Sequence, residues 1–280
     1  MHSICTDCGR LGADYCGFCG RVVSPHPSNM VAVPAGRFVL GTTLEQRSVL
    51  ALLMQKDEAA GSHSDRERPQ EVTLGRSFYI DKYPVRVGEY RKFLLELTPL
   101  ERKAIGVDEL KEPTEDEGDL PATGMTWEAA VAYALARGKR LPTEAEWEAA
   151  AGWDPETGTK RIFPWGDDVE SGQALCSMDG TLQPVFTYDT ARSRSALGCC
   201  DMVGNASEWT ADPFLEQYQC LPYGALDVSA GKLERQQKRS IRGGSCRGTL
   251  EECRVAWREG IDGRTRSALI GFRCAMDVKG

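Results

Sequence analysis

The stretch Gly138-Lys-Arg-Leu-Pro-Thr-Glu-Ala-Glu-Trp-Glu-Ala-Ala150 runs from the end of one expected helix into the next. Thr126 is placed to cap a first helix over residues 127–136, and Gly138 ends it because glycine tolerates the backbone conformation that follows a helix. Thr143 and Glu146 form a T-x-x-E capping box, in which each side chain bonds a free amide of the first turn. The pattern therefore predicts a second helix that begins at Thr143.

The sequence on either side of these helices predicts a mixed architecture. Alternating and helical apolar patterns predict strands at 31–33, 37–40, 72–74 and 78–80, and helices at 44–58 and 88–97. After residue 152 regular periodicity fades, and glycines, prolines and isolated aromatic residues continue to Phe272. Such a segment must satisfy its backbone polar groups through loop packing, side chains or ions. The sequence therefore indicates an α+β chain with much irregular structure, an arrangement suited to bound calcium.

Composition narrows the class of protein. The 280 residues are 41% hydrophobic, enough for a substantial core, and the formal net charge of -7 does not favour a nucleic acid partner. No run of 18 apolar residues is present, so no membrane partner is expected. The N-terminus lacks the basic and apolar pattern of a signal peptide, and eleven cysteines leave an odd number. We therefore expect reduced thiols and a cytoplasmic location.

Two C-x-x-C turns stand near the N-terminus, at Cys5–Cys8 and Cys16–Cys19. Zinc prefers four tetrahedral ligands, and a structural site takes all four from protein. The sequence therefore predicts that residues 1–23 form a zinc ribbon with a structural zinc ion. Residues 24–29 are predicted to form a proline-containing linker. Two disulfides or a redox pair are the alternative. The ribbon surface is free to bind a protein partner.

Seven motifs, which follow one another along the main body of the chain, together resemble the pattern of a known family. They are Val33-Pro-Ala-Gly36-x-Phe38-x-x-Gly41, Phe78-Tyr-Ile-Asp-Lys-Tyr-Pro-Val85, the stretch from Gly138 to Ala150, Phe163-Pro-Trp-Gly166, Asp201-Met-Val-Gly-Asn-x-x-Glu-Trp-Thr210, Arg242-Gly-Gly-Ser245 and Ile270-Gly-Phe-Arg273. Together they resemble the formylglycine-generating enzyme, or sulfatase-modifying factor, family. The resemblance implies a C-type-lectin-like fold over residues 30–280.

The family contains enzymes and non-enzymes, so fold alone does not give function. The resemblance implies that the enzymes oxidise a substrate cysteine with copper held by two cysteines, with four residues between them, after the Arg-Gly-Gly-Ser motif. Here Cys246 and Cys253 have six residues between them, so the pair is out of register. We therefore predict two core thiols and no catalytic residue. A copper-dependent cysteine oxidase with unusual ligand spacing is the alternative.

The resemblance also implies a calcium site. In the family a loop ion is held at the positions that match Asp201, Gly204, Ala206 and Glu208. Two carboxylates and two backbone carbonyls would supply the oxygen ligands that calcium prefers. The alternative is that Asp201 and Glu208 only cap backbone amides.

The C-terminal segment, residues 242–273, has the spacing of a non-enzymatic branch that includes the variable proteins of diversity-generating retroelements. In that branch framework residues are separated by diversified positions. The matching positions here are Arg247, Gly248, Thr249, Glu252, Trp257, Glu259, Gly260, Ile261, Thr265, Ser267, Ala268 and Leu269. They mix chemical types without a helical or strand period, which suits an adaptable binding face with Trp257 as its anchor. An ordinary surface loop with Trp257 in the core is the alternative.

The sequence thus predicts a non-enzymatic protein that binds a protein or other ligand through its C-terminal segment. A regulator that contacts nucleic acid through the ribbon is a third hypothesis. Arg10 and Arg21 favour it, whereas the acidic net charge opposes it.

Overall fold

The computed structural model describes residues 3–4, 11–12, 29–54, 66–107, 117–168, 178–217 and 238–278. Two short strands, β1 (Ser3–Ile4) and β2 (Leu11–Gly12), pair near the N-terminus. Cys5, Cys8, Cys16 and Cys19 lie outside the described residues, as do the three histidines. The zinc ribbon therefore stays a prediction.

A four-stranded sheet carries the C-terminal segment. Its strands run in the order β11 (Arg258–Asp262), β10 (Lys238–Arg242), β9 (Ser207–Pro213) and β12 (Ile270–Phe272). All pairs are antiparallel except β12 with β9. Consequently β11 and β12 form opposite edges of the sheet, although they are neighbours in sequence.

The remaining strands form smaller sheets. One contains β13 (Ala275–Asp277), β6 (Phe78–Asp81) and β3 (Met30–Val33), and two-stranded sheets pair β4 (Gly36–Leu40) with β5 (Gln70–Leu74) and β7 (Trp153–Asp154) with β8 (Thr159–Lys160). The strands predicted at 31–33, 37–40, 72–74 and 78–80 are confirmed. Between β8 and β9 the described residues form neither helix nor named strand, as expected for the irregular segment.

The helices are α1 (Leu44–Met54), α2 (Val87–Glu96), α3 (Pro99–Ala104), α4 (Trp127–Ala136) and α5 (Glu144–Gly152). Thr126 and Thr143 cap α4 and α5 as predicted, and the Thr143–Glu146 capping box is formed. Helix α3 was not predicted, although Thr98 and Glu101 form a capping box there too. None of the described helices has the length and apolar character to cross a bilayer.

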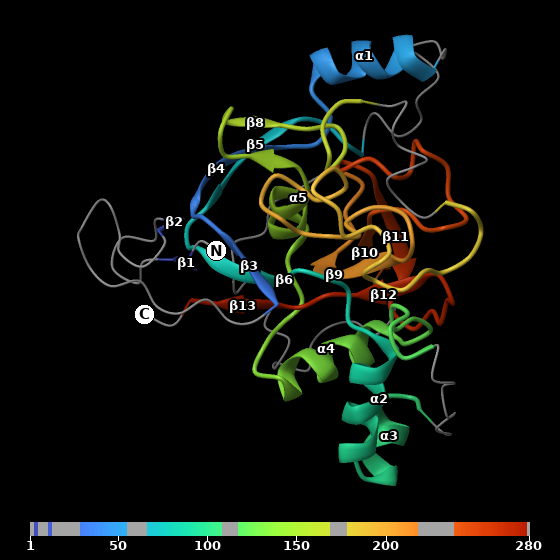
Figure 1. Cartoon of the computed structure of the whole chain (residues 1–280). Coiled ribbons are helices and arrows are strands. Elements are labelled where there is room, and N and C mark those ends of the chain that lie inside the picture. Colours follow the sequence, from blue (N-terminus) through green and yellow to red (C-terminus); the bar gives the residue numbers. More distant parts are fainter. Residues whose placement is uncertain are drawn as a thin grey trace.

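Helix α5 occupies the middle of the molecule, with α1 projecting at one end and α2, α3 and α4 at the other (Figure 1). Every residue of α5 is buried, including Glu144, Glu146 and Glu148. Trp147 has no exposed surface and packs in one core cluster with the strands of the smaller sheets. A second cluster joins α2 and α4 to the four-stranded sheet. The buried glutamates of α5 require cationic partners, because an unpaired buried charge is costly.

Candidate functional site

Four buried arginines hold the C-terminal segment in place. Arg242, Arg254, Arg258 and Arg273 are between 0% and 5% exposed. Each pairs with a glutamate outside the segment, from α5, from β9 or from the chain that precedes β5. The guanidinium group has five donors in a planar fork, so each arginine can fix backbone and carboxylate together.

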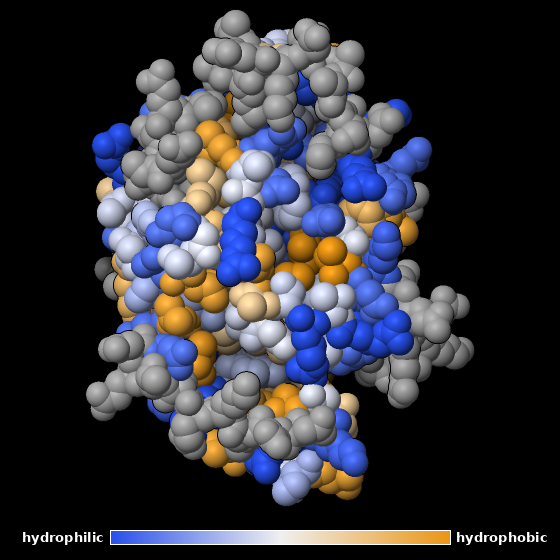
Figure 2. Space-filling model, turned by 90° about the vertical axis from the view of Figure 1, so that its right-hand side faces the viewer, coloured by the Kyte–Doolittle hydropathy of each residue, from blue (hydrophilic) through white to orange (hydrophobic). Residues whose placement is uncertain are grey.

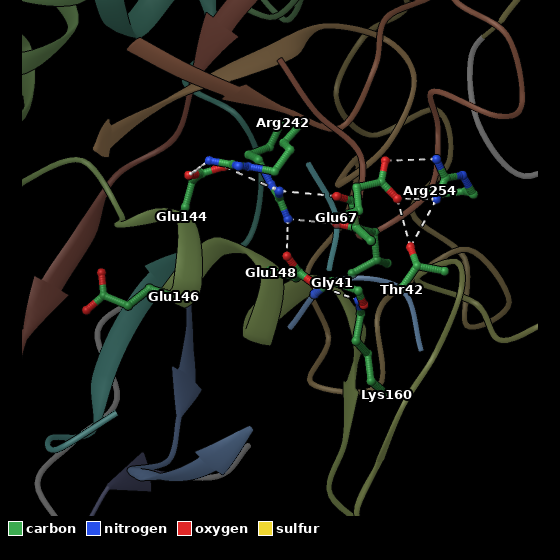
Figure 3. Close-up of polar contacts among 12 residues, drawn as sticks. Gly41, Thr42, Glu67, Glu144, Glu146, Glu148, Lys160, Arg242 and Arg254 are labelled. Atoms are coloured by element: carbon green, nitrogen blue, oxygen red, sulfur yellow. Dashed lines mark hydrogen bonds and ion pairs between the residues drawn. The ribbon is translucent and has the colours of Figure 1, made fainter. Parts of the chain in front are cut away.

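The first of these contacts centres on α5 (Figure 3). Arg258 donates to both Glu144 oxygens, from Nε to Oε1 at 2.8 Å and from Nη2 to Oε2 at 2.7 Å. Arg242 pairs with Glu148, which also binds Lys160 Nζ at 2.5 Å and the Gly41 amide at 2.7 Å. Burial acts to raise the pKa of Glu148, but Lys160 and Arg242 outweigh it and hold that pKa below its ordinary value. These ion pairs and hydrogen bonds fasten β10 to α5 and to β8.

Arg254 fixes the middle of the loop between β10 and β11. It pairs with Glu67 through two hydrogen bonds of 2.6 and 2.9 Å, and Thr42 Oγ1 donates to the same carboxylate at 2.7 Å. Burial acts to raise the pKa of Glu67, and Arg254 lowers it below the ordinary value. The loop is therefore fastened to a region almost two hundred residues earlier in sequence.

Arg273 fixes the end of the segment. Its guanidinium donates to Glu208 at 2.7 Å from both Nε and Nη2, and to the backbone carbonyls of Asp81, Lys82, Cys200 and Asp201. Trp147 Nε1 donates to Glu208 Oε2 at 2.8 Å. These bonds join β12 to β9, to β6 and to the irregular segment before β9.

Between the arginines the predicted binding residues differ in exposure. Arg247, Thr249, Glu259 and Ala268 are exposed. Gly248, Glu252, Gly260, Ile261, Thr265, Ser267 and Leu269 are half-buried. Trp257 is 5% exposed and packs in the core beneath the four-stranded sheet. The expectation of Trp257 as a ligand anchor is therefore wrong, because a side chain in the core cannot contact a ligand.

The structure distributes these residues over three places. The loop around Arg247 packs on the segment at Gly180, whose amide donates to the Cys246 carbonyl at 2.9 Å. Residues 259–261 lie on the edge strand β11, where Phe214 lies against Gly260. The loop at 263–269 precedes the opposite edge and packs near Gly124. Figure 2 shows the side of the molecule on the right of Figure 1, where hydrophobic areas alternate with hydrophilic ones.

The two cysteines of the copper alternative are buried. Cys246 and Cys253 have no exposed surface and form no disulfide within the described part of the chain, which confirms the prediction of core thiols. Cys253 Sγ lies 3.4 Å from Met178 Sδ, and burial raises the pKa of Cys246. Within the described ranges no group of three or more histidine, cysteine, aspartate or glutamate side chains is placed to hold a metal ion.

The four expected calcium ligands are buried in the turn that leads into β9 and in its first residues. Asp201 Oδ2 has no hydrogen-bond partner among the residues that the structure describes, and burial raises the pKa of Asp201 to about 7. This orphaned oxygen suits a cation. Glu208, by contrast, already accepts hydrogen bonds on both oxygens from Arg273. Of the two expected carboxylate ligands, Asp201 therefore fits a cation, whereas Glu208 would have to share its oxygens with Arg273.

The glutamates that neutralise the framework arginines were not predicted from sequence. Glu144 and Glu148 are four residues apart in a helix otherwise rich in alanine, and that spacing places them on one helix face. Glu67 had no comparable signal, because it lies in a polar stretch typical of an exposed loop. Its burial depends on Arg254, which is remote in sequence.

The fold and the arginine framework define a mixed α and β domain of the C-type-lectin-like kind, in which irregular chain is fastened by buried ion pairs. The chain belongs to the sulfatase-modifying factor enzyme 1-like domain family, whose model matches residues 21–278.

Solved structures show the same fold. PvdO from Pseudomonas aeruginosa has a TM-score of 0.61 at 24% identity, covering 89% of this chain and 94% of that one. Treponema denticola variable protein 1 has a TM-score of 0.59 at 19% identity, covering 89% and 95%. The predicted fold class is thereby confirmed for the main body.

Curated relatives include enzymes and a protein named inactive. Hercynine oxygenase of Mycolicibacterium smegmatis is 34% identical over 210 residues, which are 65% of this chain and 45% of the relative. The inactive C-alpha-formylglycine-generating enzyme 2 of Bos taurus is 29% identical over 302 residues, 88% of this chain and 87% of the relative. The chain spans about half the length of the hercynine oxygenases it matches.

Proposed function

We propose that this chain is a non-enzymatic binding protein that contacts its ligand through exposed side chains of the C-terminal segment, residues 242–273. The observation that carries the proposal is the separation of roles within that segment. Arg242, Arg254, Arg258 and Arg273 are buried and paired with glutamates, whereas Arg247, Thr249, Glu259 and Ala268 are exposed between them. The backbone is therefore held mainly by the buried ion pairs, and among these four exposed side chains Arg247 adds one long hydrogen bond, from Nε to the Gly180 carbonyl at 3.4 Å.

The burial of the cysteines supports the same proposal. A thiol must form a thiolate to bind copper or attack a substrate, and burial raises the pKa of Cys246. Both thiols also lack a solvent-exposed surface through which a substrate peptide could approach. The names of the relatives do not decide between the two functions, because both enzymes and a protein called inactive are among them.

The specific form of the proposal is a variable protein of a diversity-generating retroelement. Its support is the motif spacing, together with a shared fold with Treponema denticola variable protein 1. The test is the DNA beside the gene. We expect a reverse transcriptase gene and a near-copy of the sequence that encodes residues 242–273, with differences confined to adenines of the copy. Absence of both contradicts this form of the proposal.

Copper binding distinguishes the proposal from the oxidase alternative. Titration of the reduced protein with copper(I), in competition with a chromogenic chelator, is expected to show no site that is lost in the Cys246→Ser/Cys253→Ser double variant. Turnover of a cysteine-containing peptide by the copper-treated protein is expected to be absent. A stoichiometric site lost in the double variant, together with turnover, would establish the oxidase instead.

We also propose that the turn before β9 binds calcium, with Asp201 as its charged ligand. An ion there would supply a partner for the orphaned Asp201 oxygen and so stabilise the folded state. We expect millimolar calcium to raise the melting temperature of the wild-type protein and to have little effect on Asp201→Asn. Magnesium is the control ion, because it requires near-octahedral coordination and so fits an irregular set of oxygen ligands poorly. An equal calcium shift in both proteins contradicts the site.

For the N-terminal cysteines we propose a structural zinc ion, with the ribbon surface available to a protein partner. Native mass spectrometry of the full chain is expected to show one bound zinc that denaturation removes. A native mass without zinc contradicts the ribbon.

A further inference from the structure

A pocket lies away from the C-terminal segment, where β6 ends and the chain turns into α2 beside α4. Tyr83 and Phe186 line it from two different loops, and Tyr133 lines it from α4. Tyr83 and Phe186 meet edge to face, with ring centroids 4.9 Å apart. The space is about 160 Å³. A cavity of roughly 150 Å³ can hold one benzene ring, so this pocket has room for a molecule of that size.

The acidic groups of the pocket are already bonded. Asp81 accepts from Lys139 Nζ at 2.5 Å and from the Cys274 amide at 3.0 Å. Glu89 accepts from the amide and the guanidinium of Arg86, at 3.0 and 3.2 Å. The charged lining residues are therefore two acids and two bases in two ion pairs. A cationic guest would find no free carboxylate among these described lining residues.

The donors of the pocket retain unused capacity. The Lys139 ammonium has three protons and, among the described residues, hydrogen-bonds only Asp81. Asn29 also lines the pocket, and its side-chain amide makes no hydrogen bond to any described residue. Spare donors beside aromatic rings match a guest with an anionic acceptor at one end and an apolar ring at the other.

We propose that this pocket binds a small aromatic carboxylate, with the carboxylate on Lys139 and Asn29 and the ring against Tyr83 and Phe186. The exposed part of Phe186, 44% of its surface, then becomes covered by the guest. The site is independent of the C-terminal segment, because none of its lining residues belongs to residues 242–273. It would give the domain a second, small-molecule ligand.

Benzoate is the probe, titrated into the full-length protein and followed by isothermal titration calorimetry and by amide chemical shifts. We expect a dissociation constant on the order of 1 mM, as suits a ligand of this size. Lys139→Met is expected to weaken benzoate binding about tenfold or more, because it removes a charge-assisted hydrogen bond. Benzyl alcohol, which keeps the ring and lacks the charge, is expected to bind weakly and equally to both proteins.

Three further variants keep the test decisive. Lys103→Met removes an exposed lysine on α3 and is expected to leave benzoate binding unchanged. Lys139→Arg keeps the charge and the Asp81 pair, and is expected to bind within about threefold of wild type, which excludes a mere folding defect. Phe186→Ala is expected to weaken benzoate and benzyl alcohol alike. The proposal is overturned if the wild-type protein binds no benzoate at a concentration of about 20 mM, 20-fold above the expected dissociation constant. It is also overturned if Lys139→Met binds benzoate as tightly as wild type.

Discussion

Glu148→Gln is expected to lower the free energy of unfolding by about 3–5 kcal/mol, because it removes the counter-ion of buried Lys160 and leaves buried Arg242 with only its longer, 3.4 Å ion pair to Glu144. Glu148 and Arg242 have no exposed side-chain surface, and Lys160 is 4% exposed. Glutamine keeps the shape of the side chain, so the loss reports charge rather than volume. Urea unfolding followed by circular dichroism measures the change.

Glu96→Gln provides the matched control for this variant. Glu96 pairs with Arg137 at 2.7 Å, but its side chain is 56% exposed. Exposed ion pairs contribute little, so we expect an unchanged urea midpoint. If Glu148→Gln also leaves the midpoint unchanged, the ion pairs around α5 do not hold the segment, and the proposed framework is wrong.

Arg273→Met is expected to have an effect of similar size, about 3–5 kcal/mol of unfolding free energy. The change leaves Glu208 buried without its cation and removes the donors to the carbonyls of residues 81, 82, 200 and 201. Methionine retains most of the packing volume, so the cost again comes from lost polar contacts. Hydrogen exchange should show loss of protection first in β9 and β12.

Arg264→Met is the control for Arg273→Met. Arg264 pairs with Asp262 in the same segment, but its side chain is 58% exposed. Its removal should change neither the urea midpoint nor the exchange rates of β9. Equal losses from the two variants would mean that burial of the arginine is not what matters.

The local elements of this fold could be predicted from sequence, because their signals are local. Thr126, Thr143 and Glu146 marked the beginnings of α4 and α5, and the apolar runs indicated β3 to β6. Helix α3 could have been predicted from Thr98 and Glu101, which form the same capping box. Ordered motifs then predicted the family, which its model confirms over residues 21–278.

The candidate site could be predicted only in part, because its contacts are remote in sequence. The pairing of Arg254 with Glu67, or of Arg273 with Glu208, has no local pattern. Trp257 lies in a polar segment and was expected to be exposed, yet the sheet above it places it in the core. The motif spacing also suggested that residues 247–269 form a single binding face. The strand order instead places β11 and β12 at opposite edges of the four-stranded sheet.

The separation between a buried framework and an exposed, freely changeable surface can be measured in one experiment. A library of the protein with every single substitution at residues 239–273 is displayed and treated with protease, and each variant is scored for its survival. We predict that Arg247, Thr249, Glu259 and Ala268 accept most side chains, whereas Arg242, Arg254, Arg258 and Arg273 accept almost none. Equal intolerance at the exposed positions, or free replacement of the buried arginines, would contradict the account.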